Sequence, residues 1–180
     1  MRIISGKYKG RFIPAPKGMK ARPTTDYAKS ALFNILEHKI DFTELRVLDL
    51  FCGTGGISFE FLSRGAKEVI AVDSDYQSTE FCNKFARELG YQNQYRAYKN
   101  DCLRALKQLT GQFDLVFCDP PYTYEDHAKL ANAVTESVLA PGGLMIMEHG
   151  FKTNLETQPF YTETRKYGNI YFSFFNKPSE

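Results

Sequence analysis

The chain has 180 residues, a length that suits a single domain with a full hydrophobic core. Apolar residues make up 43% of the sequence and charged residues 24%, ordinary globular values that exclude a disordered or collagen-like chain. No apolar run could span a bilayer, and Lys7, Lys9 and Arg11 interrupt any signal-like stretch, so we expect a cytoplasmic protein.

The positive charge is concentrated in the N-terminal segment. The net charge is only +2, but residues 1–29 hold eight basic residues and one acidic residue. A basic segment on a mildly acidic body is typical of a protein that binds a polyanion such as nucleic acid.

This segment is predicted to be an extension of the main domain. Residues 2–5 and 11–13 flank Tyr8-Lys9-Gly10 and are expected to pair as a short hairpin. Apolar residues then recur at helical spacing from Ala28 to Leu36, which predicts a helix over 25–38 with Thr24 or Thr25 as its N-cap. We therefore expect a single domain, in which residues 1–24 form a basic extension and residues 25–180 form the core.

The core alternates between strands and helices. The predicted strands cover 46–51, 68–72, 95–98, 113–118 and 143–147, and the helices between them cover 56–64, 75–89, 102–109 and 125–139. Residues 161–166 and 170–175 flank Tyr167-Gly168-Asn169, which indicates a closing hairpin. The pattern predicts an α/β fold of the Rossmann type, with a mostly parallel sheet and an antiparallel C-terminal hairpin.

A glycine-rich turn follows the first core strand. The apolar run Val47–Phe51 leads directly into Gly53-Thr54-Gly55-Gly56. Glycine allows a sharp turn and a close approach of another molecule to the backbone, so we expect a nucleotide-type ligand beyond this strand. Asp49 lies within the strand, where its carboxylate could orient the loop or face a cationic ligand.

Three more strands end in a carboxylate that should reach the same edge of the sheet. Asp73 could accept both hydroxyls of a ribose. Asp101 could meet an adenine amine or could simply cap the helix that follows it. A dinucleotide fingerprint would need glycine where Ser58 stands, and an acidic loop suits S-adenosylmethionine, which has an amino group, a sulfonium and no pyrophosphate.

The sequence Asp119-Pro120-Pro121-Tyr122 follows the fourth strand. Two consecutive prolines make the chain stiff, so Asp119 and the Pro120 carbonyl would present two hydrogen-bond acceptors close together. A planar exocyclic amine could donate to both while its lone pair faces an electrophilic methyl group. Tyr122 would stack on the same base. The alternative is a rigid turn with a buried tyrosine.

No metal site is predicted. The cysteines form no C-x-x-C pair, and the three histidines show no metal-ligand spacing. Glu148-His149 ends the fifth strand at the functional edge, where a minor role is conceivable, although a packing role is the simpler interpretation.

These motifs resemble a known family. The segments 49–56 and 119–122 are similar to class I methyltransferases that use S-adenosylmethionine to modify exocyclic amines. Residues 4–6, 22–26, 31–36, 63–66 and 167–168 narrow the resemblance to the bacterial family that methylates guanine N2 in small-subunit (16S) ribosomal RNA.

The resemblance implies a seven-stranded sheet, S-adenosylmethionine over the glycine loop, and a segment 22–26 that closes over the cofactor. It implies a monomer without metal that acts on ribosomal RNA, within a partly assembled small subunit. The implied catalytic residues are Asp119, Pro120, Pro121 and Tyr122. The implied cofactor-binding residues are Thr24, Asp49, Phe51, Gly53, Gly55, Asp73, Asp101 and Cys102. The implied RNA contacts are Lys7, Lys9, Arg11 and Arg22.

Other functions stay open at this point. A non-catalytic RNA-binding or ribosome assembly factor could keep the same fold. A methyltransferase acting on DNA or on another RNA would share the two motifs, although 180 residues leave no visible target-recognition domain. An NAD oxidoreductase would share only the glycine turn and Asp73.

Overall fold

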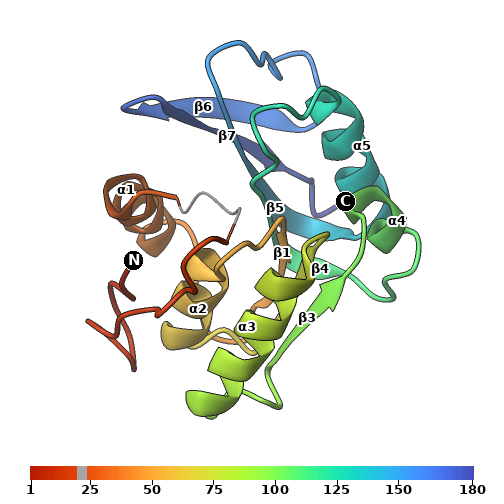
Figure 1. Ribbon diagram of the computed structural model, residues 1–180. Helices are drawn as coiled ribbons and strands as arrows, with labels where there is room; N and C mark the ends of the chain where they lie inside the picture. The colour runs from red at the N-terminus through yellow and green to blue at the C-terminus, as the bar shows by residue number, and fades with distance from the viewer. Residues whose placement is uncertain (20–23) are drawn as a thin grey trace.

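Seven strands form one sheet in the order β3-β2-β1-β4-β5-β7-β6 (Figure 1). The structure is a computed structural model that describes residues 1–19 and 24–180. The parallel strands are β1 (Arg46–Leu50), β2 (Glu68–Asp73), β3 (Tyr95–Lys99), β4 (Phe113–Cys118) and β5 (Leu139–His149). The antiparallel pair is β6 (Tyr161–Tyr167) and β7 (Ile170–Asn176). The predicted fold class is therefore confirmed.

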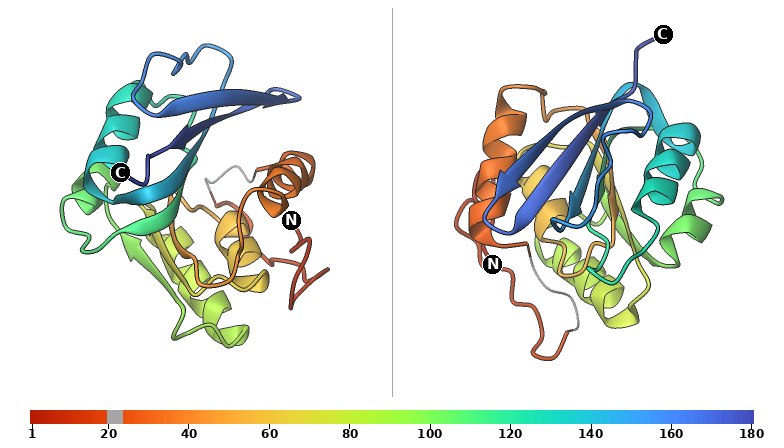
Figure 2. Two further views of the ribbon diagram at one scale, coloured as in Figure 1. Left: turned by 180° about the vertical axis from the view of Figure 1, so that it is seen from behind. Right: turned by 90° about the horizontal axis from the view of Figure 1, so that it is seen from above.

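Helices cover both faces of the sheet (Figure 2). Helices α1 (Asp26–Glu37), α2 (Gly56–Ser63) and α3 (Tyr76–Glu88) share one apolar core with the sheet, and α4 (Cys102–Leu106) and α5 (His127–Ser137) share the other. Neighbouring strand residues divide between the two cores, as Val47 and Leu48 do, because successive side chains in a strand point to opposite faces. Within the described residues, no helix is long and apolar enough to cross a membrane.

Strand β5 begins earlier than the sequence predicted. The prediction was 143–147, but the strand starts at Leu139, which pairs with Phe113 before a register shift. Gly142 has φ of 74° at this irregularity, a conformation that glycine adopts without strain. The early start leaves α5 ending at Ser137 rather than near 139.

The N-terminal hairpin forms, but it is smaller than predicted and lies outside the sheet. Arg2 and Phe12 make a single antiparallel bridge, flanked by hydrogen bonds from Ile3 N to Arg11 O (2.9 Å) and from Ile13 N to Met1 O (3.0 Å). The hairpin packs against α2 instead, since Lys7 N donates to Ser63 O over 2.7 Å.

Gly6 allows this close packing. Its φ is 80°, and a Cβ atom there would lie only 1.9 Å from Ser63 O. A larger residue at position 6 would therefore separate the hairpin from α2.

A buried ionic cluster also fixes the hairpin. The Glu60 carboxylate accepts from Ile4 N (2.8 Å), Ser5 N (3.0 Å) and Arg64 Nε (2.8 Å). Lys29 is fully buried, 3.5 Å from Glu60, and donates to Arg2 O over 2.5 Å. Burial lowers the pKa of Lys29, and the neighbouring Glu60 opposes that shift. Lys29 thus belongs to the interior and is not part of the basic surface.

Candidate active site

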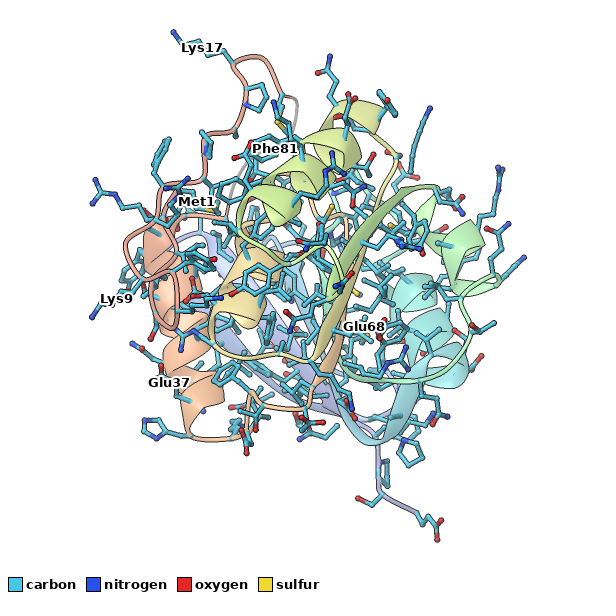
Figure 3. All side chains as sticks on the ribbon, turned by 90° about the horizontal axis from the view of Figure 1, so that it is seen from below. Met1, Lys9, Lys17, Glu37, Glu68 and Phe81 are labelled. Atoms are coloured by element: carbon cyan, nitrogen blue, oxygen red, sulfur yellow. The ribbon has the colours of Figure 1, made fainter. Side chains whose placement is uncertain are left out.

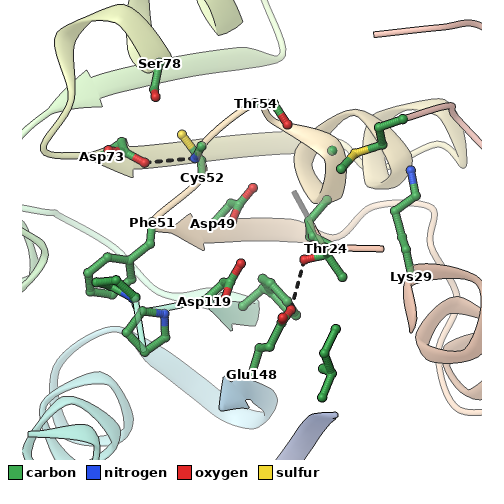
Figure 4. A pocket seen from close by; sticks show the side chains of 18 of the residues that line it. Thr24, Lys29, Asp49, Phe51, Cys52, Thr54, Asp73, Ser78, Asp119 and Glu148 are labelled. Carbon is green, nitrogen blue, oxygen red and sulfur yellow. Dashed lines mark hydrogen bonds between the residues drawn. The ribbon is translucent and has the colours of Figure 1, made fainter. Parts of the chain in front are cut away.

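A cavity of about 380 Å³ opens at the carboxyl ends of β1, β2, β4 and β5 (Figure 4). It brings together most of the predicted site residues, namely Thr24, Asp49, Phe51, Gly53, Asp73, Asp119, Pro120, Pro121 and Tyr122. Among the described residues, the predicted Gly55, Asp101 and Cys102 do not line it. The predicted Arg22 lies outside the described residues.

The glycine loop turns sharply as it leaves β1. Phe51 N and Cys52 N both donate to Val72 O, over 2.8 and 3.1 Å. Phe51 has φ of 63°, a left-handed conformation that is costly for a bulky side chain. Gly55 also has a positive φ of 76°, and a Cβ there would meet the Phe59 ring at 2.6 Å. Gly55 therefore lets the loop pack closely against the Phe59 ring of α2.

Asp73 ties the loop to β2. Its Oδ2 accepts from Gly53 N over 2.8 Å, and its Oδ1 accepts from Asp75 N over 2.9 Å. Each carboxylate oxygen can accept more than one hydrogen bond, so these two contacts leave acceptor capacity that faces the cavity.

Asp49 lies at the bottom of the same cavity and is only 1% exposed. Burial raises its pKa to about 7, Asp73 adds to the shift, and the hydrogen bond from Ser58 Oγ (2.6 Å) opposes it. Ser58 stands where a dinucleotide fingerprint would have glycine. A cation beside Asp49 would favour the ionised carboxylate, so this position is electrostatically suited to a positively charged ligand.

Asp101 caps α4 in the structure. Its Oδ1 accepts from Arg104 N over 2.9 Å, which is the alternative that the sequence left open. Cys102 is the first residue of this helix, 3% exposed, and burial raises the pKa of its thiol to about 12. A role for either residue beside an adenine ring stays a prediction.

The segment Asp119–Tyr122 leaves β4 where Asp119 N donates to Leu50 O over 3.2 Å. Pro121 O then accepts from Tyr124 N over 2.8 Å, which closes the turn. Tyr122 is 57% exposed at the cavity mouth, and its ring lies beside Gly150, where a Cβ would be 3.5 Å away. The alternative of a rigid turn around a buried tyrosine is therefore wrong.

Glu148 lines the cavity, at the edge of the sheet where the sequence allowed the pair Glu148-His149 a minor role. Its Oε2 accepts from Thr24 Oγ1 over 2.9 Å, and both residues are only 7% exposed. The signal in the sequence was its position directly after an apolar strand, at the same edge as Asp119.

The neighbouring His149 is engaged at both ring nitrogens. Nδ1 donates to Gly150 O over 2.9 Å, and Nε2 accepts from Ser173 Oγ over 2.7 Å. Burial lowers the pKa of His149, which favours the neutral ring, and the residue also lines the cavity.

The basic hairpin extends away from the cavity. Met1 lines the cavity beside the start of α2, whereas Lys7 lies at the far end of this eight-residue helix, roughly 12 Å along its axis. The Lys7 ammonium lies over the rings of Tyr8 (5.2 Å) and Tyr91 (5.8 Å). Figure 3 shows Lys9 and Lys17 pointing outward from the N-terminal segment.

Solved structures share this fold. "Putative methyltransferase yhhF from Escherichia coli" matches with a TM-score of 0.86 at 24% identity, covering 100% of this chain and 99% of that one. The "T. Thermophilus 16S rRNA N2 G1207 methyltransferase (RsmC) in complex with AdoMet and Guanosine" matches with a TM-score of 0.71 at 22% identity, covering 89% and 45%. These likenesses show that the chain has the fold of those two proteins, a seven-stranded sheet with helices on both faces.

The sequence match identifies the family. The chain belongs to the family described as Conserved hypothetical protein 95, whose model matches residues 1–176. It is 37% identical over 172 residues to "Putative rRNA methyltransferase YlbH" of Bacillus subtilis, with 92% of each chain covered. It is 34% identical over 152 residues to "Ribosomal RNA small subunit methyltransferase D" of Haemophilus influenzae, covering 82% of this chain and 78% of that one.

Proposed function

We propose that this protein methylates the exocyclic N2 amine of a guanine in small-subunit ribosomal RNA. The observation that carries the proposal is that the Asp119–Tyr122 turn and the glycine loop border one cavity. The names of the two sequence relatives support ribosomal RNA as the substrate, and one supports the small subunit. The guanosine named with the N2 methyltransferase of similar fold supports guanine as the base.

In this proposal the β1 and β2 side of the cavity holds the cofactor. Asp49 faces its positive charges; burial raises the pKa of this carboxyl group to about 7, and a cation beside it would favour the ionised form. Asp73 accepts the ribose hydroxyls, and Gly53 and Phe51 form the adjoining wall. Asp101 and Cys102 approach the adenine from α4, and Thr24 approaches from the opposite side. When bound, S-adenosylmethionine supplies the electrophilic methyl group.

The β4 and β5 side holds the base. The Asp119 carboxylate and the Pro120 carbonyl accept the two N–H groups of the guanine amine, which directs the nitrogen lone pair toward the cofactor. Tyr122 stacks on the ring, and its exposure leaves room for this contact. Asp119 is also placed to accept the proton that the methylated nitrogen releases. Placement and electrostatics of this kind account for several kcal/mol in enzymes generally.

The RNA is expected to present an unpaired guanine, because extruding a base is least costly when it is already unpaired. Lys7, Lys9, Arg11 and Arg22 would contact the phosphate backbone. In this proposal a partly assembled small subunit presents the nucleotide.

Mass spectrometry of ribosomal RNA nucleosides from cells with and without the gene tests the proposal. We expect N2-methylguanosine in the small-subunit RNA to decrease by one residue per molecule when the gene is deleted. Transfer of tritium from labelled cofactor to RNA by the purified protein provides the direct assay. Cofactor binding without methylation of any RNA would instead favour a non-catalytic RNA-binding factor.

A further inference from the structure

The turn that follows β5 carries an exposed aromatic ring beside the cavity mouth. Phe151 is 76% exposed, the highest value among the large apolar side chains that the structure describes. The preceding residue, Gly150, adjoins Tyr122, because a Cβ atom at Gly150 would lie 3.5 Å from the Tyr122 ring. Phe151 itself does not line the cavity, and the proposed methyl transfer assigns no role to it.

Two lysines lie beside aromatic rings in this region. A single exposed apolar residue is common on protein surfaces, so the charge around Phe151 is the more informative feature. Lys152 Nζ lies 5.8 Å from the centroid of the Phe151 ring. On β6, Lys166 Nζ lies 5.6 Å from the Tyr171 ring, which stacks on His149 of the cavity wall. Aromatic rings with basic groups beside them are typical of surfaces that bind single-stranded nucleic acid.

The exposed charges on the two sides of Tyr122 have opposite signs. The segment that leads from Tyr122 into α5 exposes Glu125 and Asp126, which would repel phosphate groups. In the other direction the sheet continues from β4 to β5, β7 and β6, and there the exposed residues Lys152 and Lys166 follow (Figure 1). An RNA strand that leaves the cavity is therefore favoured across the ends of β5 and β7.

We propose that Phe151 stacks on the nucleobase next to the target guanine in the RNA strand, and that Lys152 contacts the phosphate of that nucleotide. This inference rests on the proposed function. Extruding the guanine removes a stacking partner from its neighbour, which contributes to the cost of extrusion. Adjacent strands are about 4.8 Å apart, so rings that follow β4 and β5 can receive consecutive bases. Phe151 would thus replace the stacking partner that the neighbouring base has lost.

The test combines Phe151→Ala with RNA that lacks one base. The substrates are copies of the RNA that the wild-type protein methylates, either unmodified or with an abasic nucleotide directly 5′ or directly 3′ of the target guanine. For the wild-type protein we expect one of the two abasic positions to raise KM roughly 5- to 150-fold, the range for one stacking contact. Phe151→Ala should raise KM for the unmodified RNA by a similar factor. The abasic nucleotide should then add less than about twofold, because both changes remove the same contact.

Three further variants serve as controls. Phe151→Tyr keeps the aromatic face and should keep both the wild-type KM and the abasic penalty. Tyr98→Ala removes an exposed ring from β3, the edge strand at the opposite end of the sheet from β6, and should leave KM near the wild-type value. Lys152→Ala should reduce the slope of log affinity against log salt by about 1. Turnover at saturating RNA should stay near wild type in all of these variants, because none of the three residues lines the cavity.

The abasic penalty decides the outcome. If Phe151→Ala keeps the full penalty at both positions, the ring does not stack on a neighbouring base and the proposal is overturned. An unchanged KM in Phe151→Ala would overturn it as well, and would leave a protein partner as the occupant of the exposed ring. Failure of the wild-type protein to methylate any guanine would instead refute the proposed function, so the two failures are distinguishable.

Discussion

The two sides of the cavity are prepared to different degrees. On the β1 and β2 side, Asp49 accepts a hydrogen bond from Ser58 of α2, and Asp73 accepts from Gly53 N of the glycine loop and from Asp75 N. On the β4 and β5 side, a proline turn and the 57% exposed Tyr122 border the mouth. The first side is thus fixed by short hydrogen bonds between strands β1 and β2, the glycine loop and α2, whereas the second side is shaped by a proline turn and an exposed aromatic ring. Substitutions on the two sides should therefore have separable effects.

The largest effect is expected for Asp119→Ala. Removing a group that orients the reacting amine should lower turnover roughly 10²- to 10³-fold. The affinity for S-adenosylhomocysteine should remain close to wild type, because Asp119 lies on the base side. Single-turnover transfer of a tritiated methyl group and calorimetry measure the two quantities. Normal turnover would remove Asp119 from the mechanism, and an equal loss of cofactor affinity would remove the separation between the sides.

On the cofactor side, Asp49→Asn is expected to alter the pH dependence of stability. The unfolded carboxyl ionises near its ordinary pKa of 3.8, whereas the folded one keeps its proton up to about 7. The unfolded state therefore binds fewer protons in this interval, and stability due to Asp49 falls as the pH rises from about 4 to about 7. Asparagine removes this loss, so between about pH 5 and about pH 8 the stability of the variant should rise relative to wild type by on the order of 2–3 kcal/mol.

Urea unfolding of both proteins at about pH 5 and about pH 8 measures this difference, and calorimetry should show weaker cofactor binding by the variant. Ser58→Ala is the matched control, because it removes the hydrogen bond to Asp49 but keeps the carboxyl group. Parallel stability curves for wild type and Asp49→Asn would mean that the carboxyl titrates at an ordinary pKa.

On the base side, Tyr122→Ala should weaken RNA substrate binding. Loss of one stacking contact corresponds to about 1–3 kcal/mol, or roughly a 5- to 150-fold rise in KM. Tyr122→Phe keeps the aromatic face and should stay near the wild-type KM. If the alanine and phenylalanine variants behave alike, the exposed ring does not stack on the base.

The sequence predicted the features that depend on short stretches of chain. The glycine loop after β1, the Thr25 cap of α1 and the closing hairpin all follow from neighbouring residues. The Thr24–Glu148 hydrogen bond joins residues 124 positions apart, so no local pattern could reveal it. In the sequence, Lys29 counts as one more basic residue of the N-terminal segment. Its burial against Glu60 results from the packing of α1 on α2, which the sequence pattern does not reveal. The individual cofactor and RNA contacts remain predictions, because they depend on the shape of a second molecule as well as on this chain.

The smallest effect on turnover is expected from substitutions in the basic hairpin, because its basic residues lie outside both sides of the cavity. Neutralising Lys7, Lys9 and Arg11 to alanine should weaken RNA binding and reduce the slope of log affinity against log salt by about 2–3, because up to three phosphate contacts are lost. The three residues are exposed, and Lys7 lies at the far end of α2, so turnover at saturating RNA should stay close to wild type.

Alanine at the exposed Lys99, Lys107 and Lys129 is the matched control for net charge and should leave the slope steeper than that of the hairpin variant. Equal slopes for the two triple variants would show that general charge, and not the hairpin, attracts the RNA. A fall in turnover instead would mean that RNA bound at the hairpin helps to position the base, and the cavity could not be treated as two independent sides.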